Sequence, residues 1–340
     1  MTSGAAAEPD FAGTSTTGSA SSSLLDSAWL RFAIRRVGRL LLSVWVLVTL
    51  AFLMIHLVPG DPVRSALGPD APNVLVQERR QALGLDDPMW QQYVDYLGNL
   101  MSWNPGESIL TGEPISTLLS DSLPATLEIA LLAFAFTVVV AVPLGTVTAA
   151  LTRGGRRRGT ELVFTSSSVV VGAIPEFLLA VGLVYVFSVK LEWLPIATRG
   201  GPGSYVLPVI ALGLGPALIL ARILRVELLA VLGTDYIRTA RAKRMPFWRI
   251  GAFHALPNAL TAVLTLAGLL VSGMVAGTVL VETIFAWPGL GSTIVESILT
   301  KDYPVVQAIV LVYGVGVLLI NLLVDVTLGL VDPRNTIRET

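Results

Sequence analysis

Long apolar runs separated by short polar segments dominate the chain from residue 37 onwards. About 20 apolar residues in a helix cross the hydrocarbon core of a bilayer, and because lipid offers backbone groups no partners, each crossing is expected to be helical. The pattern predicts an all-α integral membrane protein. Its six transmembrane helices are expected at about residues 37–58, 125–151, 161–189, 206–222, 258–282 and 305–330.

The fourth run is the weakest of the six, because it is short and contains Pro208 and Pro216. A kinked helix shielded by its neighbours is the favoured interpretation, since proline removes a backbone donor from a helix. The alternative drops this run, leaves five helices and places the C-terminal end on the opposite side of the membrane.

Basic residues indicate the orientation. With six spans, 17 of the 23 Lys and Arg residues flank or fill the segments on the side that holds both chain ends. The positive-inside rule places both termini in the cytoplasm. The loop 59–124 is then external, with one or two short helices expected within 74–100. A five-helix topology would break this segregation.

Composition supports a membrane protein, because 53% of the residues are hydrophobic and 14% are charged, against about 25% charged in soluble domains. The net charge of −1 does not favour nucleic acid as a partner. Cysteine is absent and the two histidines, His56 and His254, lie far apart, so disulfides and a His-rich or Cys-based metal site are excluded. Residues 1–28, rich in Ser, Thr, Ala and Gly, predict a disordered cytoplasmic tail before a transmembrane domain at 29–335.

The cytoplasmic loop 223–257 predicts two short helices that form a basic knob at the membrane surface. Residues 236–243 contain no helix breaker, Thr234 or Asp235 can cap them, and Pro246 separates them from a second amphipathic piece at 247–254. Such a knob can lie on anionic membrane lipid or dock into a groove on a partner. Taken alone, the loop also fits a plain topology-setting segment.

This loop is similar to one found in binding-protein-dependent ABC importer permeases, which has the form Glu-Ala-Ala, three residues, Gly, nine residues, Ile-x-Leu-Pro. Arg238, Thr239 and Ala240 fall on the triplet, Arg244 falls on the glycine, and 254–257 fall on the last four positions. Arg and Thr in the triplet are usual in the peptide branch of this family. Arginine at 244 is unusual and implies either a different turn or a turn strained by about 1 kcal/mol.

Further segments also resemble the dipeptide, oligopeptide and nickel branch of these permeases. They are 52–62, 83–88 with 92–93 and 96–97, 123–128, 281–291, 302–307, 321–325 and 332–334. The resemblance runs from about Arg31 to Arg334. It implies the type I ABC importer permease fold in a bacterial inner (cytoplasmic) membrane. It also implies a second similar permease subunit, two ATP-binding subunits that use ATP and Mg, an external substrate-binding protein and a peptide substrate. The residues implied to couple to an ATP-binding subunit are Tyr236, Arg238, Thr239, Ala240, Arg241, Ala242, Arg244, His254, Leu256 and Pro257.

The resembling segments at 59–62 and 287–291 are interpreted as turns at the outer interface. The turn at 287–291 is expected to place Trp287 in the headgroup region. Glycines in the last two spans, such as Gly268, Gly277 and Gly314, predict close helix approach at a subunit interface or within the chain.

Acidic residues inside apolar spans usually face the bundle interior or a wet cavity. Glu176 follows Pro175 in mid-span and is the candidate for lining the translocation path. The alternative is a helix–helix hydrogen bond between Glu176 and a Ser or Asn on a neighbouring helix, such as Asn321. Glu282 and Asp325 are expected to be structural.

No Gly-x-x-x-x-Gly-Lys-Ser/Thr loop occurs in the sequence, so the chain is not expected to be an enzyme or to bind a nucleotide cofactor itself. The function predicted is a permease subunit that forms half of the path for di- and oligopeptides. A nickel or glutathione importer of the same family is an alternative. An ion-driven secondary transporter is another, and it would predict paired intramembrane acids and an inverted repeat.

Overall fold

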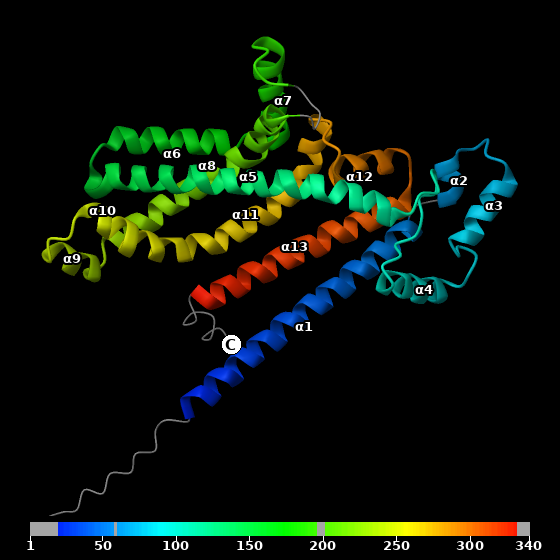
Figure 1. Cartoon of the computed structure of the whole chain (residues 1–340), viewed down its shortest axis with the longest axis horizontal. Coiled ribbons are helices and arrows are strands. Elements are labelled where there is room, and N and C mark those ends of the chain that lie inside the picture. Colours follow the sequence, from blue (N-terminus) through cyan, green and yellow to red (C-terminus); the bar gives the residue numbers. More distant parts are fainter. Residues whose placement is uncertain (1–19, 58–59, 196–200, 332–340) are drawn as a thin grey trace, which may run out of the picture.

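The computed structural model describes residues 20–57, 60–195 and 201–331, and these ranges are predominantly helical (Figure 1). Five helices are long and apolar enough to cross a membrane, and a bent pair can make a sixth span. The five are α1 (Ala20–Leu57), α5 (Ile115–Thr152), α8 (Val206–Leu232), α11 (Leu256–Ile284) and α13 (Tyr303–Val331). The all-helical fold and the number of spans agree with the prediction.

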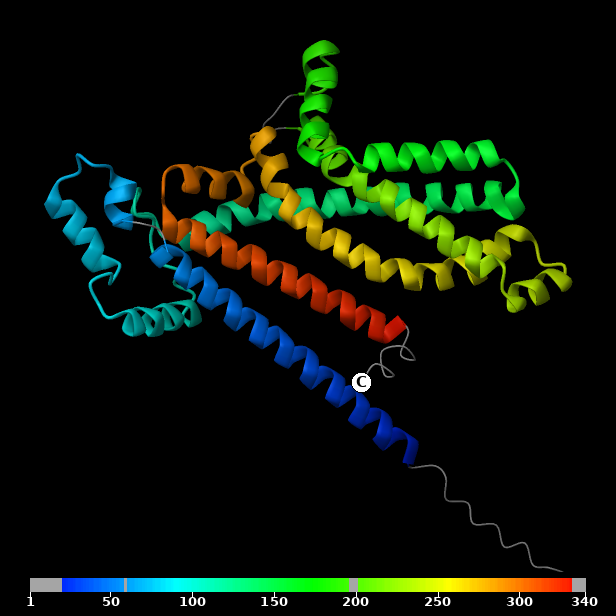
Figure 2. The same cartoon turned by 180° about the vertical axis from the view of Figure 1, so that it is seen from behind.

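The bent pair corresponds to the third predicted span, at residues 161–189. Helix α6 (Arg158–Gly172) and helix α7 (Glu176–Leu183), which continues into a π-helical turn at Val184–Lys190, meet at 94°. Pro175 stands between them, and the residue before a proline is driven out of the helical region. Figure 2 shows α7 pointing away from the parallel bundle at this bend.

Helix α8 is longer and more buried than the weak fourth run suggested. It continues ten residues past the predicted end at 222, and half of its most apolar window is buried within the chain. Arg225 suggested a cytoplasmic loop, but its side chain is buried and pairs with Glu161 of α6 at 2.8 Å. The structure therefore does not support the five-helix alternative.

Helix α8 packs against α5 more extensively than any other described pair of helices. Two glycines allow the close approach of the α5 and α8 backbones. A Cβ atom on Gly145 of α5 would lie 2.7 Å from the carbonyl oxygen of Ala221, and one on Gly213 of α8 would lie 2.9 Å from that of Ala133. Small residues let helix backbones approach this closely.

Helices α1 and α13 lie side by side along one flank of the bundle (Figures 1 and 2). Arg36 of α1 forms an ion pair with Asp325 of α13, and Gly314 packs against Leu47. On the other side of α13, Gly268 of α11 contacts the Val324 side chain. Asp325 is thus structural, and these glycines form seams within the chain. Helix α1 begins at Ala20, so residues 20–28 of the predicted tail are helical; residues 1–19 lie outside the described ranges.

Short helices cover the end of the bundle remote from the 233–255 segment. They are α2 (Pro62–Leu67), α3 (Asn73–Ala82), α4 (Met89–Met101) and α12 (Leu290–Leu299). Helix α5 starts at Ile115, within the segment 59–124 that was predicted to be external. Asp61 caps α2 by accepting from the Val63 amide at 3.0 Å. Residue 58, at the end of the first predicted span, and residue 59, the first of the predicted turn 59–62, are outside the described residues.

The predicted place of Trp287 in the headgroups is wrong. Its side chain is 1% exposed, its Nε1 donates to the Ala125 carbonyl of α5 at 3.0 Å, and its ring packs edge-on against Tyr205. A buried indole N–H is stabilised when it donates to such an acceptor. Nearby, the buried Glu282 carboxylate accepts from the Gly291 amide at the start of α12, at 2.6 Å, which confirms its structural role.

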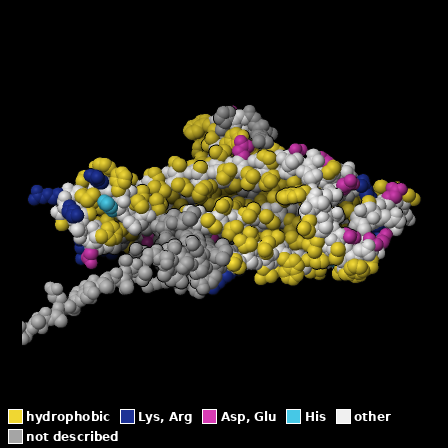
Figure 3. All heavy atoms as spheres, turned by 60° about the horizontal axis from the view of Figure 1, so that its bottom comes forward, with side chains coloured by type: hydrophobic (Ala, Val, Ile, Leu, Met, Phe, Trp, Pro, Cys, Tyr) yellow, Lys and Arg dark blue, Asp and Glu magenta, His cyan; other side chains and the backbone are white. Residues whose placement is uncertain are grey.

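Charge is divided between the two ends of the molecule. Figure 3 shows dark blue basic side chains at the end that carries α9 and α10, most of the acidic ones at the opposite end, and apolar side chains between them. This distribution suits helices that cross a bilayer lengthwise.

Candidate functional site

The predicted knob is present at the basic end of the bundle, between α8 and α11 (Figure 1). Helix α9 (Asp235–Ala242) follows α8 after two residues, with Thr234 in an extended conformation at its N-cap. Helix α10 (Phe247–Ile250) follows Pro246 and continues through a π-helical turn at Gly251–Ala255 directly into α11. The second piece is therefore the first turns of α11 rather than a separate helix.

The inner face of α9 is anchored in the hydrophobic core. Ile237 is fully buried and belongs to one cluster with Leu232 of α8 and Ile250 of α10, against which Ala240 and Met245 pack. Fully burying an isoleucine contributes about 1.5–3 kcal/mol. Ile237 and Ile250 were missed as site residues; their signal was an apolar position in an otherwise basic stretch.

Arg241 fastens α9 to the end of α8. Its Nη2 donates to the carbonyl oxygen of Leu232 at 2.8 Å. The outer face of α9 is exposed: Tyr236 is 47% exposed, and the exposed Arg238 pairs with Asp235, one turn earlier, at 3.0 Å. Thr239 is exposed too, and its hydroxyl bonds within the helix.

Arg244 occupies the turn position where the resembling loop has glycine. Its φ is 57°, the left-handed region. The Arg244 amide donates to Arg241 and the Met245 amide donates to Ala240, at 2.8 and 3.3 Å. This is the Schellman arrangement that usually carries glycine at this position. The turn therefore has the expected form and carries the strain of a side chain at positive φ.

The second half of the predicted set lies beside the first. Leu256 packs against the cluster that holds Ile237, His254 is half-buried in the π-helical turn, and Pro257 is exposed in the first turn of α11. The structure thus brings the predicted residues of 236–244 and 254–257 together. Two aromatic residues that were not predicted, Trp248 and Phe253, are about two-thirds exposed and form an edge-on pair beside them.

Glu176, the predicted path residue, is the first residue of α7 at the 94° bend. It lines a cavity of about 270 Å³ together with Pro175, Gly215 and Pro216. A Cβ atom on Gly277 of α11 would lie 2.5 Å from the Glu176 carboxylate, so the carboxylate rests against that helix. The Asn321 side chain instead accepts from the Ser272 hydroxyl at 3.1 Å. No hydrogen bond to Glu176 occurs within the described ranges.

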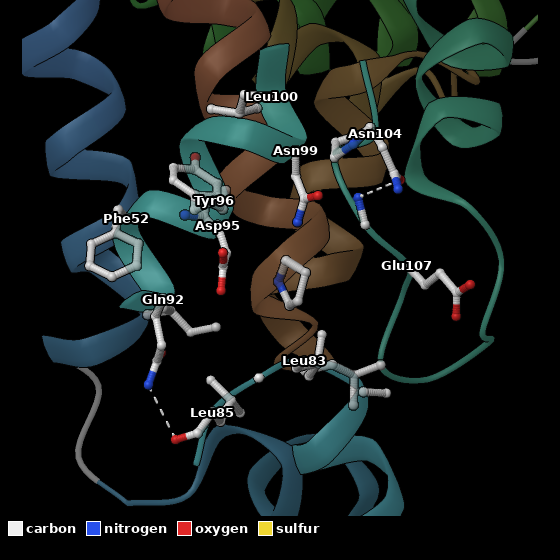
Figure 4. A pocket seen from close by; sticks show the side chains of 18 of the residues that line it. Phe52, Leu83, Leu85, Gln92, Asp95, Tyr96, Asn99, Leu100, Asn104 and Glu107 are labelled. Carbon is white, nitrogen blue, oxygen red and sulfur yellow. Dashed lines mark hydrogen bonds between the residues drawn. The ribbon is translucent and has the colours of Figure 1, made fainter. Parts of the chain in front are cut away.

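A second cavity, of about 370 Å³, lies at the opposite end between α1, α4 and the segment that leads into α5. Figure 4 shows Phe52, Tyr96, Asn99 and Glu107 around it. Gln92 stabilises its edge by donating to the carbonyl oxygens of Leu85 and Asp87, at 3.3 and 2.7 Å. Burial raises the pKa of the Tyr96 hydroxyl. This cavity was not predicted from the sequence.

Spanning helices around a mid-bundle carboxylate, with an exposed basic helix on a rigid base at one end, define the class as a membrane permease. The family model described as the binding-protein-dependent transport system inner membrane component matches residues 141–337. The model of the N-terminal part of such membrane components matches 29–130. The chain belongs to this family and is a permease component of an ABC importer, a multi-pass protein of the bacterial inner membrane.

Two relatives illustrate the relationship. The di/tripeptide transport system permease protein DppB of Pseudomonas aeruginosa (strain UCBPP-PA14) is 38% identical over 335 residues, covering 90% of this chain and 98% of the relative. The glutathione transport system permease protein GsiC of Escherichia coli (strain K12) is 34% identical over 304 residues, covering 89% and 98%.

A solved structure is similar in fold. It is a chain of the MetNI methionine ABC transporter in an inward-facing conformation, with a TM-score of 0.54 and 20% sequence identity over 63% of this chain and 96% of that one. This similarity supports the type I importer permease fold.

Proposed function

We propose that the chain forms half of the translocation path of a peptide importer and that α9 couples this path to an ATP-binding subunit. One observation carries the coupling role. The inner face of α9 is fixed by buried Ile237 and by Arg241, while its outer face, with Tyr236 and Arg238, is exposed at the end of the bundle. A helix held this way is pre-organised to dock on an ATP-binding subunit and to transmit its movement to the spanning helices.

The assembly that fits this role contains a second permease subunit, two ATP-binding subunits that hydrolyse ATP with Mg, and an external binding protein. The α9 end and both chain termini face the cytoplasm, since 17 of the 23 Lys and Arg residues flank or fill segments of that side. Closure of the ATP-binding subunits around nucleotide shifts the population between inward- and outward-open states through α9.

The substrate we propose is a small peptide, because the two relatives described above are named for di/tripeptide and glutathione transport. The carboxylate of Glu176 supplies a charge that suits a peptide's terminal ammonium group. Its placement at a bend, lining a cavity and without a hydrogen-bond partner among the described residues, fits a path residue better than a helix-to-helix tie.

The coupling role is tested with the whole transporter in vesicles, comparing Tyr236→Ala with Trp45→Ala on the exposed face of α1. A central interface aromatic contributes about 2 kcal/mol or more when truncated, so Tyr236→Ala should reduce ATP-dependent uptake roughly 30-fold while the protein still inserts. Trp45→Ala should leave uptake near normal. Equal uptake by both variants would remove α9 as the coupling element.

The substrate role is tested by uptake into cells that lack the gene and carry either the native chain or Glu176→Gln. Labelled dipeptide, the same dipeptide with an acetylated amino terminus, and nickel are supplied side by side. Glu176→Gln should lower uptake of the free dipeptide only, and Glu296→Gln on exposed α12 should lower neither. Loss of nickel uptake with intact peptide uptake would reassign the substrate, and uptake that follows an ion gradient would reject ATP as its source of energy.

A further inference from the structure

Helix α4 is amphipathic, and its apolar face is the exposed one. Trp90 and Val94 are 70% and 57% exposed, and Met101 is 86% exposed. Together with the half-buried Leu97 they recur at the spacing i, i+4, i+7 and i+11, which places all four on one face of the helix. No residue of α4 is fully buried. These four residues form an apolar stripe that α4 presents to its surroundings.

The polar residues of α4 lie on a different face, which borders a cavity. Gln91, Asp95 and Asn99 follow one another at intervals of four residues. Asp95 and Asn99 line the cavity of about 370 Å³ between α4 and α1, and Figure 4 shows both side chains beside it. A helix on the surface of a water-soluble protein buries its apolar face and exposes its polar one. In α4 this order is reversed, which suits a helix whose outer surroundings are apolar.

Helix α4 is fixed to the last turns of α1 by polar and aromatic contacts. The hydroxyls of Tyr93 and Thr49 share a hydrogen bond at 2.8 Å. The Tyr93 ring packs edge-on against Phe52, with the ring centroids 5.1 Å apart. Nearer the end of α1, Gln92 Oε1 accepts from His56 Nε2 at 3.0 Å. These contacts hold α4 alongside α1 instead of beyond its end.

The contact with Thr49 indicates how deep α4 lies. Thr49 comes eight residues before the end of α1 at Leu57, which is about 12 Å along the helix. Both residues belong to the apolar span Ile34–Leu57. Leu50, next to Thr49, is 60% exposed, and Leu57 is 78% exposed. Because exposed apolar side chains of a spanning helix face lipid, α4 lies beside a part of α1 that the bilayer surrounds.

Trp103, just after α4, departs from the usual pattern of a helix end. Its φ is 56°, in the left-handed region. The Trp103 amide donates to Leu100 at 3.2 Å and the Asn104 amide donates to Asn99 at 3.0 Å, the Schellman arrangement that usually carries glycine at this position. The Trp103 side chain is 91% exposed, so packing within the described chain offsets little of the backbone strain. Tryptophan is enriched where a membrane meets water, and an indole placed there gains a favourable environment.

We infer that α4 is an interfacial helix embedded in the membrane leaflet remote from α9, with its apolar stripe among the acyl chains and Trp103 at headgroup level. Lipid is the partner that fits, because the stripe continues the exposed apolar surface of α1 around Leu50 and Leu57. In this position α4 forms a wall between the bilayer and the cavity of about 370 Å³. The cavity then opens to the external water and not to lipid.

The test uses single spin labels, which the chain accepts cleanly because it contains no cysteine. Val94→Cys labels the stripe, and Asp95→Cys labels the adjoining polar face. Val74→Cys on α3 is the matched control, since it is the same residue type and is 71% exposed. The labelled chain is assembled with cysteine-free partner subunits in phospholipid nanodiscs. Spin relaxation is then measured with oxygen, which concentrates among acyl chains, and with chromium oxalate, which stays in water.

The label at Val94 should be relaxed more by oxygen than by chromium oxalate, and the labels at Val74 and Asp95 should show the reverse order. A label introduced by Trp103→Cys should fall between the Val94 and Val74 values. If the Val94 label responds as the Val74 label does, α4 stands in water and the inference fails. If both reagents are kept from Val94 in the whole transporter, but chromium oxalate reaches it in the permease alone, a protein partner covers the stripe and lipid is overturned.

Discussion

Arg241 of α9 donates from Nη2 to the carbonyl oxygen of Leu232, the last residue of α8, across 2.8 Å. The final carbonyls of a helix lack partners within it, and a cation at that end also meets the negative pole of the helix dipole. One side chain therefore joins the end of the most buried spanning helix to the exposed helix that we propose as the coupling element.

Replacing Arg241 by alanine should loosen α9 without disturbing the spans. A hydrogen bond from a charged donor contributes about 1.5–3 kcal/mol, so amide protons of α9 should exchange at least tenfold faster in Arg241→Ala. Arg238→Ala is the matched control, because its exposed pair with Asp235 contributes less than about 1 kcal/mol. Hydrogen exchange followed by mass spectrometry measures both, and equal rates in the two variants would contradict the capping role.

Replacing Arg244 by glycine should stabilise the α9 turn. Arg244 has φ 57°, and glycine adopts this region without the roughly 1 kcal/mol that other residues lose there. Thermal unfolding of Arg244→Gly should therefore be shifted upward by one to several degrees, or its α9 amides should exchange more slowly. Lys243→Gly, one residue earlier at φ −73°, should show the opposite sign. A lower stability for Arg244→Gly would mean that the arginine side chain makes a compensating contact.

Replacing Gly145 by alanine should destabilise the α5–α8 pair. The new methyl group would meet the Ala221 carbonyl oxygen at 2.7 Å, and backbone cannot move aside cheaply, so overpacking should cost about 1–3 kcal/mol. Gly273→Ala in α11, where nothing lies within 4 Å, should be neutral or slightly stabilising. Thermal unfolding in detergent compares the two. Similar midpoints would show that α5 and α8 approach less closely than described.

The outer helices should lose local stability in acid through Asp61. Burial would raise the pKa of this carboxyl, but hydrogen bonds from Arg80 and from the Val63 amide outweigh burial and hold the pKa below its usual range. A carboxyl whose pKa is lowered by folding stabilises the folded state at a pH above its pKa in the unfolded chain. This stabilisation is lost as the pH falls through the pKa in the folded chain. Protection of residues 62–82 against proteolysis should therefore drop below about pH 4.

Asp61→Asn tests this assignment. The variant should be less protected at neutral pH, since it loses the ion pair with Arg80, and its protection should vary less between pH 5 and pH 3. Asp70→Asn, an exposed change in the same segment, should follow the native profile. A native-like acid response in Asp61→Asn would assign the effect to another carboxylate.

The sequence predicted the spans well because lipid requires long apolar helices, and the basic loop because its spacing resembles a known one. Its errors arose where charge is buried. Arg225 was placed within the cytoplasmic loop 223–257, but Glu161 and Thr152 satisfy it inside the bundle. Trp287 was placed at a headgroup because aromatic residues gather there, whereas the partner of its N–H is the Ala125 carbonyl, which no local pattern reveals.

The candidate site divides along similar lines. The members of α9 follow from spacing along one loop, whereas Ile237, Ile250 and Leu232 meet only after three helices pack. At the basic end, one cavity is lined by Arg153 of the α5–α6 turn and by Arg225 of α8, which lie more than 70 residues apart in the sequence, so no local pattern brings them together. The bend at Pro175 was marked by the proline, but its 94° angle depends on the packing of α7 against α8 and α11.

Helix α8 carries Arg225 and the Leu232 carbonyl near one end and Pro216 near its middle. Proline lacks the N–H that would bond to the carbonyl four residues earlier, and the Thr137 hydroxyl of α5 donates to the neighbouring Gly213 carbonyl at 3.1 Å. Pro216 also borders the cavity of Glu176. The helix therefore acts as a lever about 40 Å long, with its point of least stiffness beside that carboxylate. A displacement imposed at α9 is concentrated where we propose that the peptide passes.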